Sequence, residues 1–224
     1  MRIARSVVAL SAAACAALIS TSTAVAAPAP APAPAFETTP EIGILTPEAE
    51  AELYEQLEKS APVIAVYKGK EINLANGWGD AQACTEIPSG EIYCYDSTDA
   101  ADAELPAIDP AAASRMRSNA VYGPTAFSSC AVGYVCLWEN SNGGGRRLQW
   151  SAKGTKQLSD WDFRDKASSG CSNRSAGGVE VYDARTGLPD PYMVLGSPYC
   201  YNFSSAAYPT GGTFNDKADY IKIL

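Results

Sequence analysis

The C-terminal half of the chain contains the same strand-and-turn pattern twice, which narrows the folds that it can adopt. Residues 163–167 (FRDKA) return as 214–218 (FNDKA), and the strand-like run 135–139 (VCLWE) returns as 179–183 (VEVYD). The second copy is longer by about seven residues, which fall within 188–198. Each copy has roughly 45 residues and about four short apolar runs. Because one such unit cannot bury its apolar face alone, the two are predicted to pack as a sandwich of two Greek keys.

The first copy begins with a predicted β-hairpin. Cys130 and Cys136 bracket Gly133, which lets the chain reverse direction, and residues 134–138 (YVCLW) combine the aromatic and β-branched types that favour a strand. Residues 140–145 (NSNGGG) then end the strand with residue types that accept a positive φ. We therefore expect a hairpin whose start is fixed by a short disulfide.

The N-terminus has the features of a secretory signal peptide. Arg2 and Arg5 precede an apolar run at 6–19, and residues 24–26 (AVA) form a small-x-small cleavage site. The predicted signal peptide is therefore 1–26, and the mature protein is expected to be secreted. The apolar run is too short to span a membrane and no later run is long enough, so membrane insertion is not expected.

The cysteines predict a disulfide framework. Cys15 falls within the signal peptide, and the alanines before it lack the leucine-type residue of a lipidation signal, so lipidation is the less favoured alternative. Six cysteines remain in an exported chain, an even number that is typical of disulfides but allows fifteen pairings. Proximity along the chain predicts three pairs, which are Cys84 with Cys94, Cys130 with Cys136, and Cys171 with Cys200.

The chain has no histidine, which limits the chemistry that it can perform. Ser-His-Asp and Cys-His nucleophile systems are excluded, as are histidine-ligated zinc sites. Paired carboxylates or a Ser-Lys pair would remain available, and carboxylates brought together only by folding would leave no local pattern. Since no local signature of either kind is present, we expect a protein that is not an enzyme and that needs no cofactor.

Charge is distributed unevenly along the sequence. Residues 36–110 contain sixteen acidic residues and three lysines, whereas residues 111–224 contain twelve basic and nine acidic residues. The acidic part could be a removable prosegment that covers a mildly basic domain, or a region that keeps the protein in solution. An acidic chain without a basic cluster does not fit a nucleic-acid partner.

Composition and local signals divide the chain into five parts. Thr46 and Pro47 predict the N-cap and first turn of a helix, and two predicted hairpins follow it, the second closed by Cys84 and Cys94. The predicted parts are a signal peptide at 1–26, a Pro/Ala-rich linker at 27–45, a small acidic α+β unit at 46–97, a linker at 98–120, and an all-β domain at 121–224.

The region from about residue 125 to 224 resembles the crystallin-like metalloproteinase inhibitors of streptomycetes, peptidase inhibitor family 36. The resemblance is carried by the Cys130-x5-Cys136-Leu-Trp-Glu-Asn motif and by the Asp-Lys-Ala sequence at the end of each copy. It implies a βγ-crystallin-type double Greek key that holds a rigid, disulfide-framed loop in the cleft of a thermolysin-like protease.

This chain lacks the Cys-x4-Cys reactive loop of those inhibitors, so their reactive bond cannot be transferred to it. If the chain inhibits a protease, we expect an exposed, apolar segment held by prolines to take that role, since prolines lower the entropic cost of binding. The candidate inhibitory residues are Leu188, Pro189, Pro191, Tyr192, Met193, Val194 and Leu195. The alternative, which the sequence favours, is that this segment is only a variable loop of the family.

The resemblance also implies calcium-binding loops. The candidate ligands are Asp165, Ser168, Asn215, Asp216 and Asp219. Arg164 places a positive charge beside the first loop, and Tyr220 replaces a hydroxyl residue in the second. We therefore expect weak calcium binding at most.

Taken together, the sequence predicts a secreted, monomeric, peptidase inhibitor-like binding protein whose partner is an extracellular metalloprotease. The alternative is a non-inhibitory crystallin-like module of the cell envelope, structural or weakly calcium-binding. A strip of aromatic residues could also bind sugars, although strand spacing favours a place in the core. These residues are Trp138, Trp150, Trp161 and Tyr182.

Overall fold

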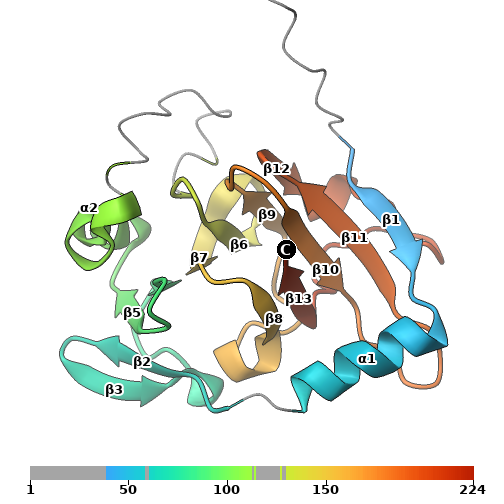
Figure 1. Ribbon diagram of the computed structural model, residues 1–224, viewed down its shortest axis with the longest axis horizontal. Helices are drawn as coiled ribbons and strands as arrows, with labels where there is room; N and C mark the ends of the chain where they lie inside the picture. The colour runs from blue at the N-terminus through green and yellow to red at the C-terminus, as the bar shows by residue number, and fades with distance from the viewer. Residues whose placement is uncertain (1–38, 59–60, 113, 115–126, 128–129) are drawn as a thin grey trace, which may run out of the picture. The chain divides into compact units, whose positions relative to one another are not determined.

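The computed structural model describes residues 39–58, 61–112, 114, 127 and 130–224, which belong to one compact unit (Figure 1). The predicted signal peptide, most of the first linker and the last part of the second lie outside these residues. The strands are β1 (Glu41–Ile44), β2 (Ile64–Tyr67), β3 (Lys70–Asn73), β4 (Ala83–Glu86), β5 (Ile92–Tyr95), β6 (Val135–Asn140), β7 (Gly144–Trp150), β8 (Gly154–Gln157), β9 (Ser169–Ser172), β10 (Gly178–Tyr182), β11 (Pro191–Gly196), β12 (Tyr199–Asn202) and β13 (Tyr220–Ile223). The helices are α1 (Pro47–Leu57) and α2 (Thr98–Ile108), with short 3₁₀ turns η1 (Leu74–Asn76), η3 (Ser141–Gly143), η4 (Leu158–Trp161) and η5 (Phe203–Ser205).

The strands form two sheets, as expected for a largely β protein. One sheet has the order β1-β11-β10-β13-β8, and the other has the order β12-β9-β6-β7-β4-β5-β2-β3. Alternate residues of both sheets point into a shared apolar core, to which Val181 and Met193 contribute from one sheet and Leu137 and Trp150 from the other. The four aromatic residues Trp138, Trp150, Trp161 and Tyr182 are buried, so they do not form a sugar-binding strip.

The sequence repeat is also a structural repeat. Strands β6 and β7 form a hairpin with β9 beside β6, and β10 and β11 form a hairpin with β13 beside β10. The third strand of each copy crosses to the other sheet, where β8 pairs with β13 and β12 pairs with β9. Each sheet is therefore completed by a strand from the other copy.

The repeated FxDKA segments lie where the two copies meet. The backbone N–H of Asp165 donates to the carbonyl oxygen of Ala218 at 2.9 Å, and the equivalent N–H of Asp216 donates to that of Ala167 at 3.1 Å. Both aspartates adopt a left-handed φ of 55°, which aspartate tolerates better than most residues. The reciprocal bonds explain why the motif occurs once in each copy.

The N-terminal part differs from the separate α+β unit that the sequence predicted. Strand β4 pairs in parallel with β7, with Cys84 opposite Leu148, so both hairpins of residues 46–97 extend the eight-stranded sheet. Trp78 is buried, and its indole Nε1 donates to the carbonyl of Trp161 at 2.6 Å. The physical reason is size, because a segment this small cannot bury its own apolar residues and instead packs them against the larger part.

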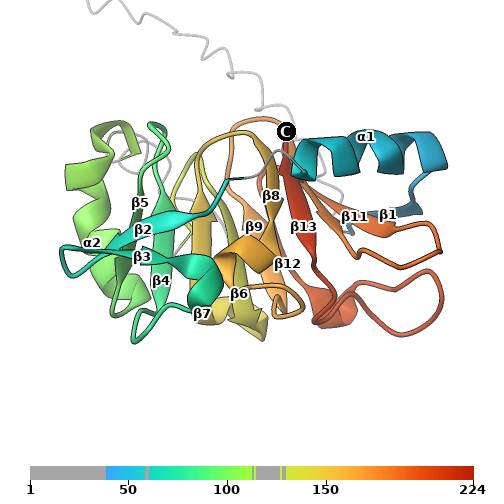
Figure 2. The same cartoon turned by 90° about the horizontal axis from the view of Figure 1, so that it is seen from below.

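The two helices lie at opposite ends of the strand arrangement (Figure 2). Helix α1 begins where predicted, with the Thr46 hydroxyl accepting from Ala49 N–H at 3.3 Å. Helix α2 occupies the start of the segment predicted as a linker, and its Asp102 pairs with the buried Arg147 of β7 at 2.8 Å. This ion pair and the buried Leu105 anchor an alanine-rich helix, which Ser97 caps at its N-terminus.

Candidate functional site: the β10–β11 loop

The segment predicted to be an exposed inhibitory loop is mostly a buried strand. Residues 191–195 belong to β11, whose backbone pairs with β1 on one side and β10 on the other. Met193 and Leu195 point into the core. A protease cleft binds an extended segment by hydrogen bonds to the backbone of that segment. Here the backbone of β11 is already hydrogen-bonded to β1 and β10. The prediction of an exposed loop is therefore wrong for residues 191–195, where apolar residues alternate because every second one is buried.

The part of that segment that remains at the surface is the loop 183–190 between β10 and β11. Leu188 lies in it with 57% of its surface exposed, the largest value among the exposed large apolar residues of the described chain. Gly187 precedes it with a φ of 72°, a conformation that glycine adopts without strain. The loop thus presents one large apolar side chain to solvent, with the exposed Pro189 beside it.

Asp190 anchors the C-terminal end of the loop. Its carboxylate is fully buried and accepts hydrogen bonds from the hydroxyl groups of Tyr54 at 2.8 Å and Tyr220 at 2.6 Å, and from the N–H of Arg185 at 2.7 Å. Burial and the neighbouring Asp190 raise the pKa of both tyrosines well above the usual range. Both hydroxyls therefore stay protonated and remain hydrogen-bond donors to this carboxylate.

Two further contacts close the loop on itself. The guanidinium of Arg185 donates from Nε to the carbonyl of Pro189 at 3.1 Å, spanning the loop next to Leu188. At the base, the N–H of Asp183 donates to the carbonyl of Pro191 at 3.1 Å. The loop conformation is thus fixed by bonds within it as well as by the scaffold below.

A second buried carboxylate, Asp219, anchors the N-terminal end of the loop. Its Oδ2 accepts the N–H of Ala184 at 2.5 Å, and Arg164 forms an ion pair with its Oδ1. Only 4% of Asp219 is exposed, and this burial raises the pKa of its carboxyl group to about 7, despite the hydrogen bond from Ala184, which lowers it. The charge on this anchor therefore changes near neutral pH.

The candidate calcium ligands fall into two groups, one around Asp216 and one around Arg164. The Asp216 carboxylate accepts hydrogen bonds from the Ser168 hydroxyl at 3.0 Å and the Asn215 side chain at 2.7 Å, and Asp165 faces Arg164. Asp219 pairs with the same Arg164 and also supports the β10–β11 loop through the N–H of Ala184. Within the part of the chain that the structure describes, no cluster of three or more Asp, Glu, Cys or His side chains is arranged to hold a metal ion.

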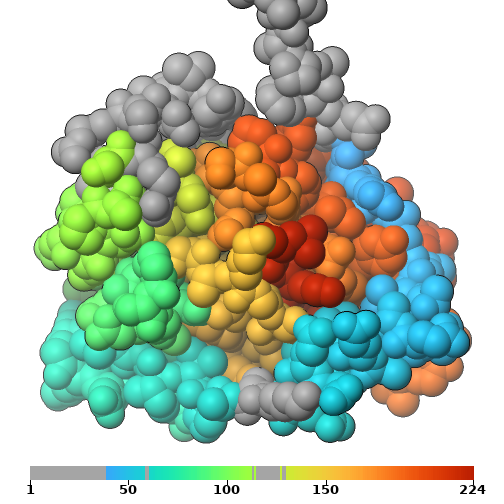
Figure 3. All heavy atoms as spheres, in the orientation of Figure 1, coloured from blue at the N-terminus to red at the C-terminus, as the bar shows by residue number. Residues whose placement is uncertain are grey.

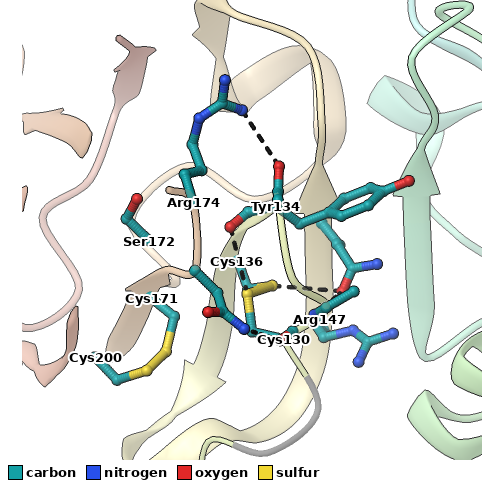
Figure 4. The surroundings of a disulfide bond; sticks show 12 residues. Cys130, Tyr134, Cys136, Arg147, Cys171, Ser172, Arg174 and Cys200 are labelled. Atoms are coloured by element: carbon teal, nitrogen blue, oxygen red, sulfur yellow. Dashed lines mark hydrogen bonds between the residues drawn. A yellow bond between two sulfur atoms is a disulfide. The ribbon is translucent and has the colours of Figure 1, made fainter. Parts of the chain in front are cut away.

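The three disulfides join the cysteine pairs that proximity predicted. Figure 4 shows two of them around β6 and β9, where Cys136 and Cys171 are direct cross-strand neighbours. The bond between Cys171 and Cys200 links β9 of the first copy to β12 of the second. It therefore fixes one of the exchanged strands in place.

Comparison with known proteins finds a match to one protein family. The model of peptidase inhibitor family I36 matches residues 123–194, which include the whole β10–β11 loop, and this match supports the resemblance seen in the sequence. Searches of curated proteins and of solved structures found no match. Among the helices that the structure describes, none is long and apolar enough to cross a membrane.

Proposed function

We propose that this chain, whose residues 123–194 carry the family I36 match, is a secreted peptidase inhibitor-like protein that inserts its β10–β11 loop into the cleft of an extracellular metallopeptidase. The family match points to a peptidase partner, and the loop lies inside the matched segment. The three disulfides fit an oxidising, extracellular compartment. The duplicated four-stranded units, with their exchanged third strands, favour a crystallin-type double Greek key as the scaffold.

The observation that carries the proposal is an exposed leucine on a loop that is already ordered. Asp190 and Asp219 fix the two ends of the loop, and Arg185 closes it beside Leu188. A loop held in its bound conformation avoids the entropic cost of becoming ordered on binding. An apolar side chain such as Leu188 suits the mostly apolar specificity pocket expected of a thermolysin-like peptidase.

Pro189 gives the loop a property that an inhibitor needs. It follows Leu188 and has no backbone N–H, so a peptidase cannot form a hydrogen bond to that position as it would with an ordinary substrate. The Pro189 carbonyl is also engaged by Arg185. These features favour a segment that enters the cleft but is cut slowly.

The test is inhibition of a thermolysin-like metallopeptidase by the mature protein, titrated against hydrolysis of a small peptide substrate. We expect inhibition at micromolar protein or below. The Leu188→Ala variant should inhibit at least about tenfold more weakly, because burying the three lost carbon atoms contributes about 2 kcal/mol.

Ile64→Ala provides the matched control. Ile64 is 45% exposed on β2 and is also a large aliphatic residue, but it does not belong to the loop. This variant should inhibit like the original protein. The proposal is wrong if the folded protein does not inhibit at micromolar concentration, or if both variants lose inhibition equally.

A further inference from the structure

A groove separates α1 from the outer face of the five-stranded sheet. It has a volume of about 520 Å³ and is lined by residues of α1, β1, β10, β11 and β13. Helix α1 packs Leu53 and Leu57 on Tyr182 and Tyr220, which leaves the outer side chains of β1 and β11 beside the groove. Figure 3 shows α1, in blue to cyan, bordering the orange and red surface of the C-terminal strands.

The floor of the groove is apolar and aromatic. Ile44 is 48% exposed there, and the Tyr192 ring packs against Tyr182 with 5.9 Å between ring centroids. The Tyr192 ring also lies directly on the backbone of Gly43, where a β-carbon would come within 2.5 Å of its Cζ atom. Glycine at this position therefore lets the tyrosine ring lie flat along the sheet.

The charged residues that line the groove are mostly acidic. Glu41, Glu52 and Glu180 come from three different elements, and Lys222 is the basic residue among the groove-lining side chains. Glu180 accepts a hydrogen bond from the Tyr182 hydroxyl at 2.5 Å. Within the described part of the chain, neither Glu41 nor Glu52 forms an ion pair, so both carboxylates are available to a ligand.

We propose that this groove binds a positively charged peptide segment, with a lysine or arginine side chain lying along Tyr192 and its charge facing Glu41, Glu52 and Glu180. Long basic side chains suit such a site, because their aliphatic part covers apolar surface while the charged end stays among carboxylates. The face of a tyrosine ring adds a favourable interaction with the cation. This site is separate from the β10–β11 loop and does not depend on the proposed inhibition.

The test is calorimetric binding of a short peptide of alternating lysine and alanine to the mature protein, with a glutamate–alanine peptide for comparison. We expect the basic peptide to bind, with an affinity that falls as salt is added. The acidic peptide should not bind. Equal binding of both peptides, or binding of a neutral oligosaccharide in place of the basic peptide, would overturn the proposal.

Removing an acidic and removing a basic side chain should change the affinity for the basic peptide in opposite directions. Loss of folding could only weaken binding. Glu52→Gln and Glu180→Gln should each weaken binding of the basic peptide roughly two- to fivefold, as expected for exposed charge pairs. Lys222→Ala should strengthen binding by a similar factor, because it removes a like charge from the groove. If Lys222→Ala weakens binding, the basic segment does not lie in this groove.

Two controls separate the groove from the rest of the surface. Glu58→Gln removes a carboxylate from the C-terminal end of the same helix, outside the groove, and should leave binding unchanged. Leu188→Ala should also leave it unchanged, because the β10–β11 loop lies outside the groove lining. Failure of peptide binding would therefore not bear on inhibition, and failure of inhibition would not bear on the groove.

Discussion

The two repeats connect their first and second strands by loops of very different construction. In the first repeat, residues 141–143 turn tightly by backbone geometry, with Asn142 at a φ of 58° and its N–H donating to the Asn202 side chain at 2.7 Å. In the second repeat, the loop 183–190 is longer and depends on the buried carboxylates of Asp190 and Asp219. The first loop is a three-residue turn with exposed hydrogen bonds to the Asn202 side chain, whereas the second is longer and is held at both ends by buried carboxylates. This difference makes the second loop the better candidate for recognition.

The largest expected effect comes from removing the anchor that only the second loop has. Asp190→Ala leaves the hydroxyl groups of Tyr54 and Tyr220 and the N–H of Arg185 without their acceptor. Each unsatisfied buried donor costs about 1–3 kcal/mol, so the free energy of unfolding should fall by at least about 3 kcal/mol in denaturant titrations. A loss below about 1 kcal/mol would show that the loop does not depend on this carboxylate.

A pH titration should distinguish the two repeats next. Asp219 has a folded pKa of about 7, above its unfolded value, so its ionisation favours the unfolded state. The contribution of Asp219 to the free energy of unfolding should be largest at acidic pH. It should fall by roughly 2 kcal/mol or more between about pH 4 and pH 7. Residue 168, the equivalent in the first repeat, is an uncharged serine.

The variant that tests this assignment is Asp219→Asn, in which the side-chain oxygen can still accept the Ala184 N–H. The decline in stability between about pH 4 and pH 7 should shrink in this variant. Chemical denaturation at a series of pH values measures it. An unchanged pH dependence would assign the decline to other carboxylates.

A smaller effect should follow from loosening the link to α1. Tyr54→Phe removes one hydrogen bond to Asp190 but keeps the ring that packs near Tyr220. Because hydrogen bonds to charged groups contribute about 1.5–3 kcal/mol, stability should fall by about 1.5 kcal/mol. Amide exchange should accelerate in loop 183–190 and stay unchanged at residues 141–143. Acceleration in both loops would contradict the difference between them.

The smallest effects are expected at the exposed tips of the two loops. Leu188→Ala and Asn142→Gly should each change the free energy of unfolding by no more than about 0.5 kcal/mol, since neither removes a buried contact. Thermal unfolding of both variants measures this. A larger loss for Leu188→Ala would mean that its effect on inhibition reflects stability rather than contact with the peptidase.

Local sequence signals predicted most elements and the pairing of neighbouring strands, but not the pairing of distant ones. The helix at Thr46, the two N-terminal hairpins, the repeat and the three cysteine pairs all appear in the structure. The parallel pairing of β4 with β7 does not follow from local pattern, because nothing in the apolar alternation of residues 83–86 specifies which strand lies beside them. Tertiary packing supplies that information.

The candidate site was only partly predictable for the same reason. Pro189 and Pro191 suggested a loop through residue 195, but the loop ends at residue 190 and β11 begins at Pro191. Proline is tolerated at the first position of a strand, so Pro191 did not exclude one. Asp190 carries no sequence signal of its role, because its partners Tyr54 and Tyr220 are brought to it only by folding.

Strands β8 and β12 each pair in the sheet of the other copy, and this exchange determines how the protein unfolds. Since each sheet contains a strand from the opposite copy, neither copy can unfold while the other stays folded. Thermal or mechanical unfolding should therefore occur in a single cooperative transition. Either copy expressed alone should stay unfolded, because it lacks the strand that the other copy supplies.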